Sequence, residues 1–169
     1  MALAPDLFVP QLRPCDFMPG GYNCTAAAAA MLLFRASRGN VKRAACTIRR
    51  QTGDRSGGLN LDQIKTVLED DYGIDGLRLY RPISQKSLLL INRSGFPVVE
   101  QVGYRPIAAT DHDCFRHSFT GGHAIFVSYA TSSWAKIGDP GADGRYRGCP
   151  DGFQHYGLSL LATALDALP

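Results

Sequence analysis

The chain has 169 residues, of which 45% are hydrophobic and 20% charged, a composition typical of a globular protein with its own core. The net charge of +3 is small and the basic residues are scattered, which excludes the concentrated positive surface of a nucleic-acid-binding protein. No segment reaches the roughly 18 consecutive apolar residues that a membrane span requires, and the N-terminus lacks the features of a signal peptide, so we expect synthesis in a cytosol.

The first part of the chain predicts helices. Residues 1–20 are rich in proline and glycine and predict an irregular N-terminal arm. Four helices are expected after it, because apolar residues recur at helical spacing behind capping residues and before glycines. They cover Cys24 to about Arg38 with Asn23 as N-cap, Val41 to Gln51, the segment after the N-cap Asn60, and Ile83 to Gly95. The basic run Val41–Arg50 is interpreted as a solvated helix face.

The second part of the chain predicts antiparallel strands. β-branched and aromatic residues mark three of them, which are Phe96–Val102, His123–Ala130 and Trp134–Asp139. The short polar link Thr131–Ser133 predicts a hairpin between the last two strands. A polar insertion at 105–121 precedes the hairpin, and the tail from residue 153 has a partly helical pattern. Helices followed by strands predict a single α+β domain over residues 1–169.

Cys24 is a candidate nucleophile because it stands directly before the alanine run Ala26–Ala30. At the first turn of a helix, unpaired backbone N–H groups and the helix dipole favour the nucleophilic thiolate. The alanines predict a slim helix against which other elements can pack closely. The alternative is that Cys24 is a small core residue, since free cysteines are often buried.

His123 and Asp139 are candidate partners of this thiol. His123 opens one strand of the predicted hairpin and Asp139 ends the other, so the two side chains are expected at the same end of the sheet. A carboxylate at hydrogen-bond distance can orient an imidazole, and the imidazole can keep a thiol deprotonated. The alternative is that both residues only form turns, since Asp139 precedes Pro140 and Gly141.

The other cysteines and histidines give weaker patterns. The five cysteines contain no C-x-x-C pair, so neither a disulfide framework nor a four-cysteine zinc site is expected, and at least one thiol should be free. Four residues could be considered as zinc ligands, namely Cys114, His117, Cys149 and His155. Their spacings match no standard zinc pattern, so we interpret the first two as part of a polar surface loop and expect no metal.

The ordered motifs resemble those of a known family. A cysteine opening an alanine-rich helix, then "GGHAIFVSY" and "IGDPG", resembles the papain-like cysteine peptidases, and the C39-like branch most closely. The stretch Arg49–Ile74 is similar to proteins encoded by tailed bacteriophages and their actinobacterial relatives. The resemblance covers residues 15–141. It implies a papain-like fold, Cys24 as nucleophile, His123 as general base and acid, Asp139 as the orienting residue, and no cofactor.

One position departs from the family pattern. These peptidases usually carry a glutamine five or six residues before the cysteine, where this chain has Met18 and Pro19. Gln11, brought back by a long loop, or Asn23 would then stabilise the oxyanion together with the Cys24 N–H.

The resemblance implies a peptidase or amidase that acts on a peptide or protein, including cell-wall peptide, through a thioester acyl-enzyme. The missing glutamine leaves a second hypothesis, a structural tail-associated virion protein with other virion proteins as partners. The implied location is the host cytoplasm at synthesis and then the virion.

Overall fold

A computed structural model describes residues 5–11, 15, 22–79, 85–94, 96–109, 121–141 and 152–167. Within them, six helices and four strands occur. In chain order they are α1 (Cys24–Ala36), α2 (Ala45–Thr52), α3 (Leu61–Asp70), α4 (Gln85–Arg93), β1 (Val98–Gly103), α5 (Arg105–Ala108), β2 (Gly122–Ala130), β3 (Trp134–Gly138), β4 (Phe153–Gly157) and α6 (Leu158–Asp166). The predicted α+β combination of helices and an antiparallel sheet is confirmed.

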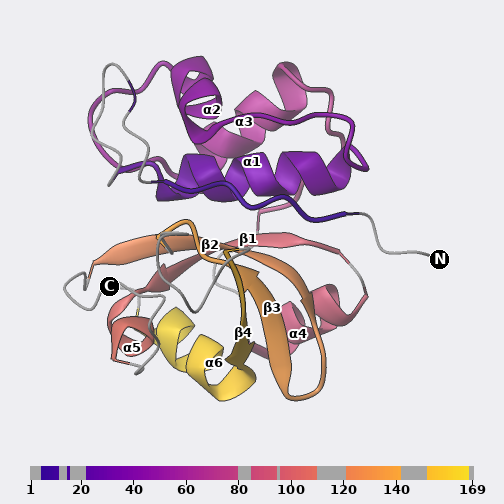
Figure 1. Cartoon of the computed structure of the whole chain (residues 1–169), viewed down its shortest axis with the longest axis vertical. Helices are drawn as coiled ribbons and strands as arrows, with labels where there is room; N and C mark the ends of the chain where they lie inside the picture. Colours follow the sequence, from indigo (N-terminus) through magenta and orange to yellow (C-terminus); the bar gives the residue numbers. More distant parts are fainter. Residues whose placement is uncertain are drawn as a thin grey trace.

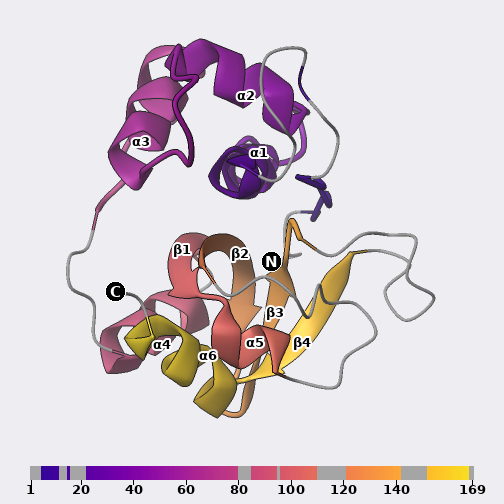
Figure 2. The ribbon, with the colours of Figure 1, turned by 90° about the vertical axis from the view of Figure 1, so that its left-hand side faces the viewer.

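Helices α1–α3 form a helical layer, and β1–β4 with α4–α6 form a sheet layer (Figure 1). Figure 2 shows α1 end-on between α2 and α3 on one side and the sheet on the other. Helices α5 and α6 contribute to a second apolar core on the opposite face of the sheet. None of the helices in the described part of the chain is long and apolar enough to cross a membrane.

Helix α1 is enclosed on all sides, as the alanine run predicts. The side chains of Ala26–Ala30 have no exposed surface, and α1 contacts α2, α3, β1 and β2. Its start at Cys24 agrees with the prediction, and it ends at Ala36, slightly before the expected Arg38. The fit against the sheet is close, because a Cβ added at Gly138 on β3 would lie 2.7 Å from the sulfur of Met31. The helix therefore has little freedom to shift relative to the strands.

The sheet has the order β1-β2-β3-β4, and all neighbouring strands are antiparallel. The predicted hairpin joins β2 and β3, and within its turn the Thr131 N–H donates to the Trp134 carbonyl at 2.8 Å. Phe126 pairs with Gly138, so the beginning of β2 and the end of β3 lie at the same end of the sheet. This register is what places the candidate histidine beside the candidate aspartate.

Three secondary-structure predictions need correction. Helix α2 begins at Ala45 rather than Val41, and the residues before it are not helical. The predicted polar insertion at 105–121 begins with a short helix, α5, whose Ile107 is fully buried. The partly helical tail is confirmed by α6, but its first residues form a strand that was not predicted, β4, which pairs with β3. The helix after Asn60 is confirmed, with a capping box between Asn60 and Gln63.

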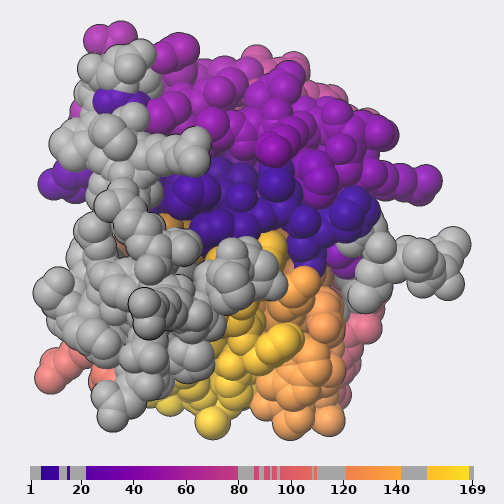
Figure 3. All heavy atoms as spheres, in the orientation of Figure 1, coloured from indigo at the N-terminus to yellow at the C-terminus, as the bar shows by residue number. Residues whose placement is uncertain are grey.

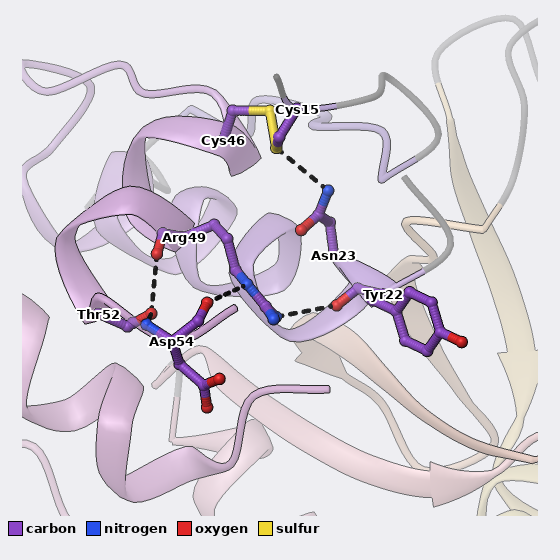
Figure 4. The surroundings of a disulfide bond; sticks show 7 residues. All are labelled: Cys15, Tyr22, Asn23, Cys46, Arg49, Thr52 and Asp54. Atoms are coloured by element: carbon purple, nitrogen blue, oxygen red, sulfur yellow. Dashed lines mark hydrogen bonds between the residues drawn. A yellow bond between two sulfur atoms is a disulfide. The ribbon is translucent and has the colours of Figure 1, made fainter. Parts of the chain in front are cut away.

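The expectation that the cysteines form no disulfide framework is wrong for one pair, because Cys15 and Cys46 form a disulfide with a Cα–Cα distance of 5.4 Å (Figure 4). A single pair separated by 31 residues leaves no recognisable spacing, since only the packing of α2 brings the two residues together. The expectation of a free thiol is met by Cys24, which is buried. The disulfide ties the chain upstream of Cys24 to the helical layer.

Reduction of this disulfide should lower the free energy of unfolding by about 3–4 kcal/mol, because a cross-link over a loop of this length restricts the unfolded chain. The loop spans 31 residues. Urea unfolding with and without reductant measures the difference. The double variant Cys15→Ser with Cys46→Ser should match the reduced protein and be insensitive to reductant, and an unchanged urea midpoint on reduction would contradict the prediction.

Residues 5–11 of the predicted N-terminal arm lie along the seam between the two layers, where Figure 3 shows them in indigo between the purple helices and the orange and yellow strands. The Asp6 carboxylate accepts hydrogen bonds from Arg35 of α1 at 3.0 Å and from Lys136 of β3 at 2.8 Å. It also accepts one from Ser128 of β2 at 2.9 Å. Asp6 therefore connects the helical layer to the sheet layer through both members of the hairpin.

Candidate active site

Three side chains singled out in the sequence meet where α1 faces one end of the sheet. His123 Nε2 lies 2.7 Å from Asp139 Oδ1, and the same imidazole interacts with the thiol of Cys24 and lowers its pKa. The exposed fractions of Cys24, His123 and Asp139 are 9%, 4% and 0%. The structure therefore brings these residues together in the order sulfur, imidazole, carboxylate, with the sulfur at the start of a helix and the other two at the end of a hairpin.

The surroundings of Cys24 favour the thiolate. Burial raises the pKa of this thiol, but the hydrogen bond and charge of His123, with smaller contributions from the Ala124 backbone and Thr25, outweigh it and lower the pKa below its ordinary value of 9.0. Cys24 is also the first residue of α1, where the positive end of the helix dipole stabilises an anion. Since the thiolate is the nucleophilic form of cysteine, this sulfur is prepared for attack on an electrophile.

The imidazole of His123 favours its protonated form. Burial lowers the pKa of His123, but the charge and hydrogen bond of Asp139, followed by those of Cys24, outweigh it and raise the pKa to about 10. The ring of Tyr104 packs edge-on against the imidazole, with a centroid distance of 4.5 Å. A thiolate and an imidazolium in contact form an ion pair that can attack with one member and donate a proton with the other.

The carboxylate of Asp139 accepts hydrogen bonds from four donors among the described residues. His123 and the Gly141 N–H contact Oδ1, at 2.7 and 2.8 Å. The hydroxyl groups of Tyr104 and Tyr156 each lie 3.1 Å from Oδ2. Burial raises the pKa of Asp139, but the charge and hydrogen bond of His123 and the other donors outweigh it and lower the pKa.

Tyr104 and Tyr156 were not predicted as site residues, because each belongs to or adjoins an element that the sequence did not predict. Tyr104 precedes α5 and Tyr156 lies on β4. Burial, followed by the charge of Asp139, raises the pKa of Tyr156 well above its ordinary value of 10.0, so its hydroxyl remains a donor. Both hydroxyl groups therefore hold the carboxylate that in turn holds the imidazole.

Gln11, the first oxyanion candidate, lies beside the residue that follows Asp139. Its backbone N–H donates to the carbonyl of Pro140 at 2.9 Å, one residue beyond Asp139. The side chain is buried, and its Oε1 has no hydrogen-bond partner within the described chain. Thirteen positions separate Gln11 from Cys24 in the sequence, and its contact with Pro140 places its backbone beside the end of β3.

Asn23, the second oxyanion candidate, is directed elsewhere. It occupies the predicted N-cap position of α1, but its side chain forms no capping bond. Its Nδ2 instead donates to Cys15 Sγ of the disulfide at 3.3 Å (Figure 4). The amide nitrogen that an oxyanion would need is therefore used to hold the disulfide.

Arg49 departs from the prediction that the basic run Val41–Arg50 forms a solvated helix face. The side chains of Lys42, Arg43 and Arg50 are exposed, but that of Arg49 has no exposed surface. It donates to the carbonyl of Tyr22, just before Cys24, at 3.3 Å. Helical periodicity in this short helix could have indicated an inward position, since Arg49 adjoins the buried Ile48 and lies four positions after the buried Ala45.

Of the four residues considered as zinc ligands, the structure describes only His155. Cys114, His117 and Cys149 lie outside the described residues. His155 is exposed on β4, and its ring packs against Trp134 with a centroid distance of 4.5 Å. No cluster of three or more histidine, cysteine, aspartate or glutamate side chains suited to a metal ion occurs within the described ranges.

The rate of any reaction that uses the Cys24–His123 pair should follow a bell-shaped pH profile. The rate should rise with pH as Cys24 loses its proton, with a midpoint below 9.0, and should fall again near pH 10, as His123 loses its proton. Alkylation of Cys24 by iodoacetamide, followed by peptide mass spectrometry, should show the rising limb alone. A single alkylation midpoint at or above the ordinary thiol pKa would contradict the ion pair.

Comparison with known proteins adds no relative: no family model, no curated protein and no solved structure matches this chain.

Proposed function

We propose that this protein is a cysteine peptidase or amidase with a papain-like arrangement of its active site. The observation that carries the proposal is the chain of interactions from the Cys24 thiol, whose pKa His123 lowers, through the imidazole to the Asp139 carboxylate at 2.7 Å. The pKa of the thiol is lowered and that of the imidazole is raised, and both shifts favour the ion pair that this chemistry uses. The position of Cys24 at the start of α1 gives the same preference independently.

The proposed reaction has two steps. The Cys24 thiolate attacks the carbonyl carbon of a peptide bond, and the resulting tetrahedral intermediate collapses as the His123 imidazolium gives its proton to the leaving amine. The product is a thioester on Cys24 and a free amine. A water molecule then attacks the thioester while neutral His123 accepts its proton, which releases the acid and restores the ion pair. Asp139 keeps the ring oriented throughout and remains ionised.

The oxyanion of each intermediate needs hydrogen-bond donors. The backbone N–H of Cys24 belongs to the first turn of α1 and has no acceptor within the helix. Gln11 is the side-chain candidate for a second donor, because it is buried beside Pro140, the residue that follows Asp139, and its Nε2 amide group can donate. Asn23 is less suited, since its amide nitrogen contacts the disulfide.

The substrate class follows from the chemistry and from the resemblance to phage-encoded proteins. We propose a peptide or protein substrate, including the peptides of a bacterial cell wall, and a location in the host cytoplasm at synthesis and then in the virion. The same site without turnover would correspond to a structural tail-associated protein that keeps a peptidase-like fold.

Chemical modification of the native protein tests the proposal. The protein is incubated with a set of peptides and with cell-wall muropeptides, and the products are identified by mass spectrometry. Samples with increasing alkylation of Cys24 by iodoacetamide are compared at equal protein concentration. We expect hydrolysis to decrease in proportion to the unmodified fraction of Cys24, because each sulfur serves one active site.

Two results would overturn the peptidase assignment. One is hydrolysis that persists after complete alkylation of Cys24. The other is the absence of any hydrolysed product together with a Cys24 thiol that reacts only near its ordinary pKa, which would favour the structural protein. Prior unfolding of the protein is the control, since it removes the contacts of Cys24 and should abolish any selective reactivity.

A further inference from the structure

Arg49 is a fully buried cation next to the segment that leads into Cys24. It lies in α2, and its side chain has no exposed surface. Three backbone carbonyls accept its hydrogen bonds: Nε donates to Asp54 at 3.0 Å, Nη1 to Tyr22 at 3.3 Å, and Nη2 to Gly57. Figure 4 shows the guanidinium between the carbonyls of Tyr22 and Asp54. The guanidinium of Arg49 therefore connects α2 to the loop that follows it and to the segment that leads into α1.

The charge of Arg49 is not balanced by a direct ion pair. Its three acceptors are neutral carbonyls, and none of the ion pairs between described side chains includes Arg49. The Asp54 carboxylate is nearby, but its oxygens accept hydrogen bonds from Ser56 and Gln63. Burying a guanidinium without a partner of opposite charge is costly, so a nearby anion would lower the free energy of this arrangement.

The Cys24 thiolate is such an anion. Tyr22, whose carbonyl accepts from Arg49, stands two positions before Cys24 in the chain. Burial lowers the pKa of Arg49, whereas the charge of Asp54 and, to a smaller extent, that of Cys24 raise it, so the interaction of Arg49 with Cys24 is favourable. By reciprocity, a positive charge that is stabilised by the thiolate must also stabilise the thiolate.

We propose that Arg49 is a positioning residue of the candidate active site, which fixes the segment before Cys24 through the Tyr22 carbonyl and stabilises the Cys24 thiolate by its buried positive charge. This inference rests on the proposed function only in that the thiolate is taken as the nucleophile. A purely structural arginine would hold the same carbonyls but would leave the protonation of Cys24 unchanged in every variant that folds.

Titration of the Cys24 thiol in four variants separates the two roles. Arg49→Met removes charge and donors, Arg49→Gln removes the charge but keeps a donor, and Arg49→Lys keeps the charge without the planar fork. Arg50→Met is the matched control, because Arg50 is the exposed neighbour on the same helix. The thiolate is followed by its ultraviolet absorbance and by the rate of iodoacetamide alkylation at Cys24, with folding verified by near-ultraviolet circular dichroism.

We expect the midpoint for Cys24 to rise by about one pH unit in Arg49→Met and Arg49→Gln and to return close to the native value in Arg49→Lys. Arg50→Met should titrate as the native protein does. If Arg49→Met does not fold, the comparison of Arg49→Gln with Arg49→Lys decides. Equal midpoints in folded Arg49→Gln, Arg49→Lys and native protein would overturn the proposal.

The titration requires no substrate, so it is independent of the peptidase assignment. A shifted midpoint without any hydrolysed product would leave the role of Arg49 intact and remove the proposed function. Hydrolysis by the native protein with an unshifted midpoint in the variants would do the reverse.

Discussion

Changing Cys24 to alanine should abolish hydrolysis, with a loss on the order of a millionfold, as in hydrolases that lose their nucleophile. The remaining residues can bind and polarise a carbonyl but can form no thioester. The fold should persist, because Cys24 is a small side chain that packs among the alanines of α1. The measurement is the initial rate of product formation for the best peptide found with the native protein, with circular dichroism as the check on folding.

Cys24→Ser is the matched variant for this prediction. A serine hydroxyl has nearly the same size, but His123 cannot hold it as a stable anion at neutral pH, so a large loss is expected here too. An alanine variant that keeps more than about one hundredth of the native rate would exclude Cys24 as the nucleophile. A serine variant with native activity would show that thiolate formation is not what the site provides.

Changing Asp139 to alanine should reduce both activity and stability. We expect the rate to fall about ten-thousandfold, because the imidazole loses the group that orients it and stabilises its charge. The free energy of unfolding should fall by about 3–5 kcal/mol, since the buried donors on Tyr104, Tyr156, Gly141 and His123 lose their common acceptor. Initial rates and urea unfolding measure the two effects separately.

Asp139→Asn is the variant that separates these contributions, and Asp70→Ala is the control at an exposed helix end. Asparagine keeps one acceptor oxygen, so it should recover part of the stability but little of the activity. The pKa of Asp139 is lowered on folding, so its contribution to stability is present above pH 3.8 and is lost as the pH falls through the folded pKa. The stability difference between native protein and Asp139→Asn should therefore shrink in acid, and a constant difference would contradict the role of the ionised carboxylate.

Local sequence signals were sufficient for the elements that carry Cys24, His123 and Asp139. The alanine run predicted an enclosed helix, and five of its residues have no exposed surface. Thr131–Ser133 predicted the hairpin, and the antiparallel register of β2 and β3 follows from it. Because both features depend on residues close in the chain, they could be predicted without knowledge of the tertiary structure.

Long-range features could not be predicted in the same way. The Cys15–Cys46 disulfide depends on how α2 packs near the start of α1, and no spacing rule encodes that packing. Tyr156 reaches Asp139 only because β4 adds to the edge of the hairpin. The other basic residues of the run that contains Arg49 are exposed, so the charge of the run as a whole did not indicate that one arginine is buried.

The location of the three catalytic candidates on two layers has a thermodynamic consequence. The sulfur belongs to the helical layer, whereas the imidazole and the carboxylate belong to the sheet layer. A sub-global opening that separates the layers would leave every helix and strand formed, yet it would return Cys24 and His123 to their ordinary protonation. Formation of the Cys24–His123 pair is therefore governed by the same equilibrium as docking of the two layers. Asp6 contacts neither Cys24 nor His123 through any described hydrogen bond, but it influences that equilibrium by its bonds to α1, β2 and β3.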